Sequence, residues 1–446
     1  MISAKKEMLI VPLLFAFITF IIIMIFCLAT GYSILIAMLA GLIAFTIAGR
    51  LNGFFYENLK EMALKGIKES FIVLEIMFLI GFLTAVWRSS GTITFFVYYG
   101  VSIITPGLFI LISFLLCCIL SYILGTSFGV AGTLGVILMV LARSGNVNEA
   151  ITAGAIISGI YFGDRGSPVS SSAILIASIT KTNIYDNVKL MFKTAGIPLV
   201  LVTIVYAVLS VLNPLKTVDT NISEALQTDF NLSLWAILPA VFMLILPLLK
   251  INIVWVFITS IFSGFLITIT LQDMSVLDTL KCCIIGYHSQ NDNLAFILNG
   301  GGAVSMLSVC GVVLLSSAYS GIFKGTNMLN VIQDSLTLLI SKIGLFGSML
   351  ICSTLVTCVF CNQTIASMMS RDLLEKPYEI AGGSPSELAI DIENSSIVLC
   401  GLIPWAISCS VPLQMLGVGY QALPFAFLLY IIPFYYIFTK KLFFFN

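Results

Sequence analysis

The sequence predicts an all-α, polytopic membrane protein with about 12 transmembrane segments, arranged as two inverted repeats with discontinuous helices. Hydrophobic residues make up 59% of the 446 residues and charged residues only 9%, whereas soluble domains contain about 25% charged residues. Long uncharged runs recur along the chain, and polar breaks interrupt them at corresponding places in the two halves. The formal net charge is zero, which offers no basic surface for nucleic acid and leaves the lipid bilayer as the expected surroundings.

The first half is expected at residues 1–212. Its first uncharged run, residues 8–49, is long enough for two crossings with a turn at residues 30–32, and it is too long for a cleaved signal peptide. A polar link at residues 50–70 follows and contains several lysines. By the positive-inside rule, these lysines and those beside both ends of the chain place both termini in the cytoplasm of a multi-pass cell-membrane protein.

A polar stretch at residues 213–230 separates the halves and carries one lysine against three acidic residues. The positive-inside rule therefore predicts that this stretch is an extracytoplasmic linker. The second half is expected at residues 231–446, with conventional spans at residues 230–249, 251–271 and 304–322.

Residues 163–172, with the sequence GDRGSPVSSS, form a polar stretch between two short apolar pieces. The piece before it, residues 150–162, is about half a crossing long, and we expect its helix to be interrupted at residues 163–164. Pieces this short are typical of a discontinuous helix, and transporters place their binding sites at such breaks. The first half has a polar break at residues 126–127 before this stretch. The second half has polar residues at 362–364 and then at 393–396, in the same order. This correspondence indicates a site formed by both halves.

Asp164 is the central functional candidate, because an unpaired carboxylate at membrane depth must bind a proton, a cation or a basic side chain. A carboxylate that has to lose its proton before it holds a cation makes the two compete for one site. That competition is the chemical basis of cation/proton exchange. The structural alternative is an ion pair with Arg165, Arg88 or Lys181.

Hydroxyl groups near the breaks supply neutral oxygens, which hard cations such as sodium bind. In the first half these are Thr126, Ser127, Ser167, Ser170, Ser171 and Ser172. The alternative for the serines is that they bond backbone groups freed by Pro168. Residues 125–129 also match the G-x-S-x-G pattern of hydrolases, but that pattern needs a strand-to-helix turn and a histidine partner. The only histidine lies in a distant polar turn, so we expect no enzyme activity.

The 11 cysteines lie mostly in apolar runs and are expected to be buried thiols rather than a disulfide framework. One C-x-x-C pattern, at residues 358–361, has no second pair nearby. No metal centre or other resident cofactor is therefore expected.

The motifs, taken in order, resemble the NhaC family of sodium/proton antiporters, within the ion transporter superfamily. Residues 125–133 are similar to the family stretch G-T-S-W-G-x-x-G-T, with Phe128 at the tryptophan, and residues 163–170 to the start of G-D-K-x-S-P-L-S-D-T-T. A third stretch, E-D-S-G-T followed by I-P-W, resembles residues 393–395 and 403–405. The resemblance covers most of the chain, from about residue 53 to residue 427, and implies a secondary transporter.

Two carboxylates of the family motifs are absent, one from each half. Ser171 stands at the second aspartate of the G-D-K motif, and Asn394 at the aspartate of the E-D pair. Each carboxylate would attract a cation strongly at low dielectric. The resemblance implies sodium/proton antiport with Asp164 as the proton and cation site. It leaves open the exchange of a small carboxylate or amino acid, as in malate/lactate exchangers, with Arg165 binding the substrate.

The expected site joins both halves of the chain. Its members are Thr126, Ser127, Asp164, Arg165, Ser167, Ser170, Ser171, Asn362, Gln363, Glu393 and Asn394. Broken helices around a buried acid favour alternating access over a channel. Sodium and protons are the expected transported ions, with no bound cofactor. The substrate, the stoichiometry and whether the protein forms a homo-oligomer stay open.

Overall fold

The computed structural model describes residues 2–103, 105–215, 226–249, 251–291, 294–295, 298–326 and 333–444. Most of these residues are helical, and the described part of the chain holds an isolated β-bridge between Tyr287 and Gly300 but no strand. Residues 216–225, most of the expected linker, lie outside the described residues.

The helices of the first half are α1 (Ile2–Thr30), α2 (Ile34–Leu51), α3 (Tyr56–Glu69), α4 (Phe71–Ser89), α5 (Thr92–Ile103), α6 (Phe109–Leu124), α7 (Ser127–Val130), α8 (Val136–Ser144), α9 (Glu149–Gly166), α10 (Ser171–Ile179) and α11 (Ile184–Leu212). The helices of the second half are α13 (Leu238–Leu248), α14 (Ile253–Thr270), α15 (Val276–Ile285), α17 (Leu307–Thr326), α18 (Gln333–Phe360), α19 (Gln363–Ile380), α20 (Pro385–Ile392), α21 (Val398–Cys400), α22 (Ile407–Leu416), α23 (Phe427–Thr439) and α24 (Lys441–Phe444). Two π-helical turns, η2 (Ala131–Gly135) and η6 (Glu393–Ile397), join α7 to α8 and α20 to α21.

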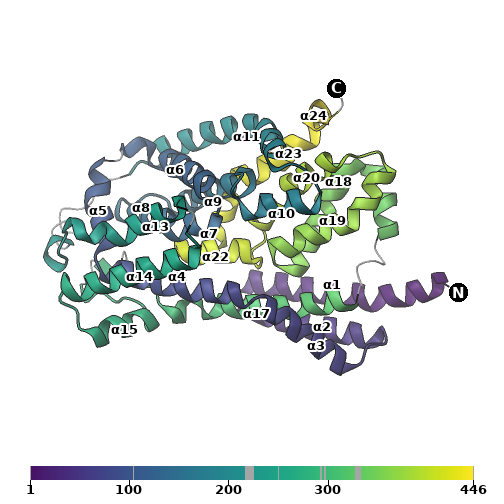
Figure 1. Ribbon diagram of the computed structural model, residues 1–446, viewed down its shortest axis with the longest axis horizontal. Coiled ribbons are helices and arrows are strands. Elements are labelled where there is room, and N and C mark those ends of the chain that lie inside the picture. The colour runs from purple at the N-terminus through teal and green to yellow at the C-terminus, as the bar shows by residue number, and fades with distance from the viewer. Residues whose placement is uncertain are drawn as a thin grey trace.

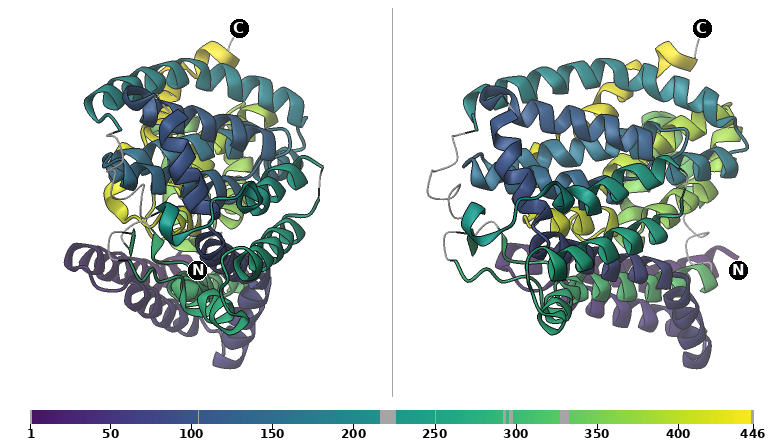
Figure 2. Two further views of the ribbon diagram at one scale, coloured as in Figure 1. Left: turned by 90° about the vertical axis from the view of Figure 1, so that its left-hand side faces the viewer. Right: turned by 60° about the vertical axis from the view of Figure 1, so that its left-hand side comes forward.

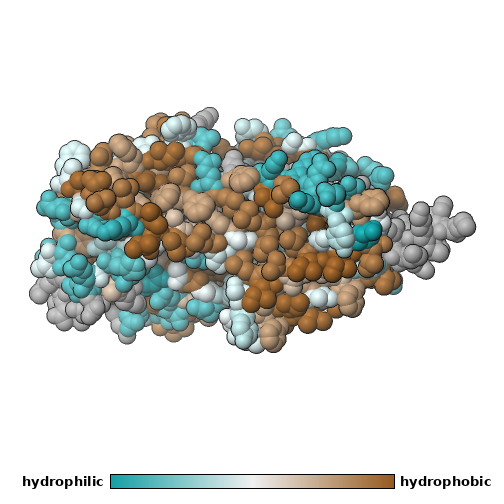
Figure 3. Space-filling view, turned by 90° about the horizontal axis from the view of Figure 1, so that it is seen from below, coloured by the Kyte–Doolittle hydropathy of each residue, from teal (hydrophilic) through white to brown (hydrophobic). Residues whose placement is uncertain are grey.

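The polytopic membrane class is confirmed by the length and composition of the helices. Six helical segments of the described chain are long and apolar enough to cross a membrane, and five shorter apolar helices accompany them. Long helices such as α1, α4 and α11 run along the long axis of the molecule (Figure 1). Apolar side chains cover much of the middle of the face in Figure 3, and polar ones gather toward its left-hand end and in a patch at upper right. The count of about 12 crossings stays a prediction.

The helices pack in two groups. In one, α2 lies between α1 and α17, and α17 also packs against α3. This group forms the lower layer in Figures 1 and 2. In the other, α9 packs against α6, α11 and α23. The broken helices that carry the candidate site belong to this second group.

Each half contains two broken helices in the same order. The first break lies between α6 and α7 and between α18 and α19, and each contains a left-handed residue: Gly125 at φ 64° and Cys361 at φ 55°. Glycine adopts this conformation without strain, whereas cysteine rarely does. The second break lies between α9 and α10 and between α21 and α22. Discontinuous helices are therefore present in both halves, as the sequence predicts.

The expected interruption at residues 163–164 is wrong by three to four residues. The helix α9 continues through Asp164 and Arg165 and ends at Gly166, so the break begins at Ser167. A side chain on Gly163 would lie 2.0 Å from the backbone of Ser121 in α6. This glycine therefore allows two helices to pack closely, and it does not end the helix.

Candidate functional site

The candidate site is centred on Asp164, in the last turn of α9 and beside the first turns of α10 and α19. Asp164 is 4% exposed. Gln363 Nε2 donates to its Oδ2 at 3.0 Å, and Ser172 Oγ donates to its Oδ1 at 3.3 Å. The Ser127 hydroxyl faces the same carboxylate. Asp164 forms no ion pair within the described chain, so the groups that hold its carboxylate are neutral.

Arg165 is 1% exposed and binds other partners than its neighbour Asp164. Its Nε donates to Asn394 Oδ1 at 3.0 Å, and its Nη2 donates to the same oxygen. Its Nη2 also donates to Thr194 Oγ1 at 2.8 Å, and the Met191 carbonyl accepts from both Nη atoms at 3.2 and 3.3 Å. Because Thr194 and Met191 belong to α11 and Asn394 to η6, the guanidinium joins the two halves of the chain.

Glu393 is the second buried carboxylate of the site. It opens the π-helical turn η6, and such turns are frequent at functional sites. Its side chain is fully buried, and neither carboxylate oxygen has a hydrogen-bond partner among the described residues. Glu393 lies close enough to Arg165 and Asp164 to interact electrostatically with both.

These contacts give a buried site with two carboxylates and one guanidinium. The guanidinium is already bound by neutral oxygens, whereas neither carboxylate has an ion pair in the part of the chain that the structure describes. The surrounding oxygens belong to hydroxyl, amide and carboxylate groups, which suit a hard monovalent cation. No group of three or more His, Cys, Asp or Glu side chains in the described chain is placed to hold a metal ion.

Comparisons with known proteins identify the family. A sequence model of the Na+/H+ antiporter family matches residues 1–174 and 159–440. The chain belongs to the Na+/H+ antiporter family. Its relatives include the malate-2H(+)/Na(+)-lactate antiporter of Bacillus subtilis, 26% identical over 91% of this chain and 86% of the relative.

Two further relatives share 26% identity with this chain. The match to the Na(+)/H(+) antiporter NhaC of Alkalihalophilus pseudofirmus covers 90% of this chain and 88% of the relative. The match to the arginine/ornithine antiporter ArcD of Halobacterium salinarum covers 74% of this chain and 70% of the relative. The resemblance to NhaC is thereby confirmed, and these relatives are antiporters rather than enzymes.

Several expected site residues of this family member stabilise the helix breaks. Thr126, Ser170 and Asn362 each accept a hydrogen bond from a backbone amide in the first turn of α7, α10 and α19. Ser167 donates to the Tyr122 carbonyl at 2.6 Å and accepts from the Val169 amide. These bonds explain how the breaks are held without regular helical hydrogen bonds. Direct binding of an ion by the same oxygens stays a prediction.

Ser172, rather than Ser171, lies next to Asp164. Ser171 is exposed in the first turn of α10, whereas Ser172 contacts Asp164 and lies 3.4 Å from Gln363 Nε2. Along the chain, the four serines of this stretch look alike, and the direction of each depends on where α10 begins. Both serines were expected to supply oxygens, but the family motif directed attention to Ser171, and the contact of Ser172 with Asp164 was not predicted.

A second buried ionic cluster was also missed. Lys440, at the end of α23, pairs with Glu387 Oε1 at 2.6 Å and with Asp391 Oδ2. Tyr436 donates to Asp391 Oδ1 at 2.9 Å, and Tyr378 donates to Oδ2. In the sequence, these charges lie in a polar link and beside the C-terminus, which are ordinary places for charges exposed to water. In the sequence, Lys440 indicated only that the C-terminus lies on the cytoplasmic side of the membrane.

Proposed function

We propose that this member of the Na+/H+ antiporter family exchanges sodium ions for protons by alternating access, with Asp164 as the shared proton and cation site. The observation that carries the proposal is a buried carboxylate whose partners among the described residues are all neutral. Ser172 and Gln363 orient Asp164 without neutralising its charge. A proton or a cation can therefore neutralise Asp164, and the two compete for the site.

Glu393 would share the transported charge. Its carboxylate is buried without hydrogen-bond partners among the described residues, and it interacts electrostatically with Asp164. Two carboxylates in one low-dielectric site repel each other when both are ionised, so binding of one cation or one proton relieves that repulsion. Arg165 would reduce the negative potential enough for the empty site to exist between transport steps.

The proposed architecture is an inverted repeat of about 12 crossings with the site at its centre. Residues 1–212 would form the first half and residues 231–446 the second, joined by an extracytoplasmic linker at residues 213–230. Support comes from the two broken helices that occur in the same order in each half. Both termini would then lie in the cytoplasm; in Figure 1 the N label lies at the right-hand end and the C label at the top of the right half.

A second candidate function is cation- or proton-coupled exchange of a small carboxylate or amino acid. It is favoured by the relatives whose names include malate, lactate, arginine and ornithine. Arg165 is a poor choice for the substrate partner in such an exchanger, because Asn394, Thr194 and Met191 already accept its hydrogen bonds. A substrate carboxylate would need another cation.

Transport assays with Asp164→Asn test the first proposal. In everted vesicles that hold a proton gradient, sodium should dequench a pH-sensitive dye with the wild-type protein and should not do so with the variant. Asp186→Asn is the matched control, because Asp186 is exposed in the first turn of α11. Competition also predicts that the half-saturating sodium concentration rises as the pH falls, by up to about tenfold per pH unit.

Two results would contradict the proposal. One is normal sodium-dependent proton movement by Asp164→Asn. The other is the absence of any sodium response in wild-type vesicles that take up labelled lactate or malate, which would favour the second candidate.

A further inference from the structure

A cavity of about 450 Å³ lies at the opposite end of α9 from Asp164. Its lining includes Arg88 at the end of α4, Glu149 at the start of α9 and Gln414 near the end of α22. Because α9 rises by about 1.5 Å per residue, the 15 residues from Glu149 to Asp164 separate the cavity from the site by about 22 Å. The cavity is therefore a separate place in the molecule.

Arg88 is a buried cation without a counter-ion among the described residues. It is 7% exposed, and its Nη1 donates to the Thr84 carbonyl at 2.7 Å. Its Nε has no hydrogen-bond partner, and no ion pair includes Arg88 in the described part of the chain. Burying a charge with so few partners is unfavourable, so an anion at this guanidinium would remove the penalty.

Gly300 lies against the guanidinium of Arg88. A methyl group placed on Gly300 would lie 3.9 Å from Nε and Nη2 and 4.0 Å from Cζ, so it would lie over the plane of the guanidinium. The φ of Gly300 is +127°, and hydrogen bonds with Tyr287 in both directions hold the loop in place. A side chain there would cover this face of the guanidinium, and glycine leaves it uncovered. A guanidinium carries pairs of parallel N–H donors. A carboxylate binds such a pair with both of its oxygens.

Arg143 is the other cation of the cavity, and its charge is already balanced. Its Nε donates to Glu149 Oε2 at 2.8 Å, and its Nη2 donates to the carbonyls of Leu416 and Gly417 at 2.8 and 2.9 Å. These bonds tie α8, α9 and the end of α22 together as one wall. The remaining positive charge of the cavity belongs to Arg88.

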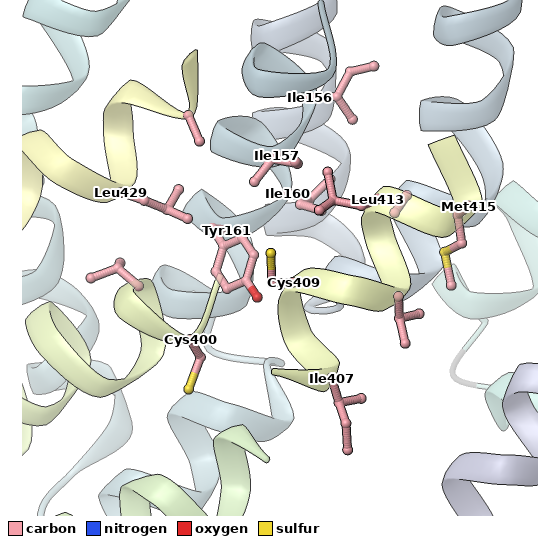
Figure 4. Close-up of a cluster of buried hydrophobic side chains, with 14 of the residues drawn as sticks. Ile156, Ile157, Ile160, Tyr161, Cys400, Ile407, Cys409, Leu413, Met415 and Leu429 are labelled. Carbon is pink, nitrogen blue, oxygen red and sulfur yellow. The ribbon is translucent and has the colours of Figure 1, made fainter. Parts of the chain in front are cut away.

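Buried apolar side chains lie along α9 between Glu149 at the cavity and Asp164 at the site. In Figure 4, Ile156, Ile157 and Ile160 of α9 lie beside α22, which carries Leu413 and Met415, and all five side chains are buried. Met415 also lines the cavity. In this conformation, an anion in the cavity would be kept apart from the carboxylates of Asp164 and Glu393, which would repel it.

We propose that this cavity is a binding site for a small carboxylate anion, with the guanidinium of Arg88 donating to the carboxylate oxygens. Asn299, Ser305 and Gln414 line the same cavity and supply polar groups for the rest of the molecule. The volume exceeds that of a three- or four-carbon acid, and small-molecule sites commonly begin near 300 Å³. The site does not depend on sodium exchange at Asp164.

Equilibrium binding of radiolabelled malate to the purified full-length protein, by a scintillation proximity assay in detergent, tests the proposal. Wild-type protein should bind malate saturably, and unlabelled lactate should compete. Arg88→Gln should weaken binding by about tenfold or more, and Arg88→Lys should also weaken it, because an ammonium keeps the charge but loses the paired donors. Asp186→Asn, at an exposed position in the first turn of α11, should bind malate as the wild-type protein does.

A second measurement needs no substitution. Phenylglyoxal modifies accessible guanidinium groups, and malate should slow its reaction with Arg88 in the wild-type protein, as followed by peptide mass spectrometry. The proposal is overturned if wild-type protein shows neither saturable binding nor protection of Arg88, or if a folded Arg88→Gln binds malate normally. Equal competition by chloride would also overturn it, since the anion would then bind without carboxylate recognition.

Discussion

Two buried ionic clusters lie only two residues apart in the chain, at Asp391 and Glu393, and they are built in opposite ways. Asp391 accepts hydrogen bonds from Tyr378 and Tyr436 and pairs with Lys440. Glu393 has no hydrogen-bond partner for its carboxylate among the described residues. Both side chains are fully buried, so burial alone does not distinguish them.

The difference separates a structural cluster from a transport site. Around Asp391, an ammonium and two phenols satisfy the carboxylate, and removal of any one partner leaves a buried charge. Among the described residues, Asp164 and Glu393 have no ion pair, and Arg165 is the one cation near two carboxylates, so a mobile cation or proton can supply the missing charge. The cluster of Lys440, Glu387 and Asp391 also attaches the end of α23 to α20, which would keep the wall of the site in place.

The largest expected effect is on stability, from Asp391→Asn. This substitution leaves the Lys440 ammonium with one acidic partner, Glu387, and should lower the free energy of unfolding by about 3–5 kcal/mol. Asp164→Asn should change it by less than about 1 kcal/mol, because Ser172 and Gln363 can bond an amide as well. Thermal unfolding of the two purified variants, in the same detergent as the wild-type protein, checks this contrast.

Transport should show the reverse order. At a temperature where both variants are folded, Asp391→Asn should still move protons in response to sodium and Asp164→Asn should not. The comparison fails if Asp391→Asn is as stable as the wild-type protein and has lost transport, because the second cluster would then take part in the exchange itself.

Much of the fold could be predicted because it depends on local properties of the chain. The run at residues 8–49 gave two helices with a turn at Gly31, since hydropathy and length alone decide that pattern. The end of α9 could not be predicted, because Gly163 can either interrupt a helix or allow a neighbour to approach. The choice depends on α6, which contacts Gly163 from about 40 residues earlier in the chain.

The candidate site shows the same difference between features that depend on local sequence and features that depend on packing. Asp164 and Gln363 were expected together because both stand out in apolar runs at helix breaks, and they form a hydrogen bond. The pairing of Lys440 with Asp391 gave no such signal, since each residue lies beside other polar residues in the sequence. Partners separated by 49 positions come together through packing of α20 and α23, which composition does not reveal.

A smaller effect is expected when the acid of the family motif is restored at Asn394. Asn394 Oδ1 accepts from Arg165 Nε at 3.0 Å, so Asn394→Asp should turn a neutral acceptor into a charged one. We expect the free energy of unfolding to rise by about 1 kcal/mol, with the half-saturating sodium concentration nearly unchanged. Thermal unfolding and dye dequenching measure the two quantities.

Asn394→Leu is the control for that gain, because it removes the oxygen that Arg165 needs and should destabilise the protein. A large rise in sodium affinity in Asn394→Asp, without a gain in stability, would show that the side chain at this position faces the cation rather than Arg165.

The smallest effect is expected for the other restored acid, Ser171→Asp. Ser171 is exposed at the start of α10, and water screens a carboxylate there from the buried site. The half-saturating sodium concentration should therefore change by less than about twofold, whereas Ser172→Ala, which removes a hydrogen bond to Asp164, should change it more. Dye dequenching across a series of sodium concentrations compares the two variants. A strong gain in affinity from Ser171→Asp would mean that α10 turns during transport and brings position 171 to the site.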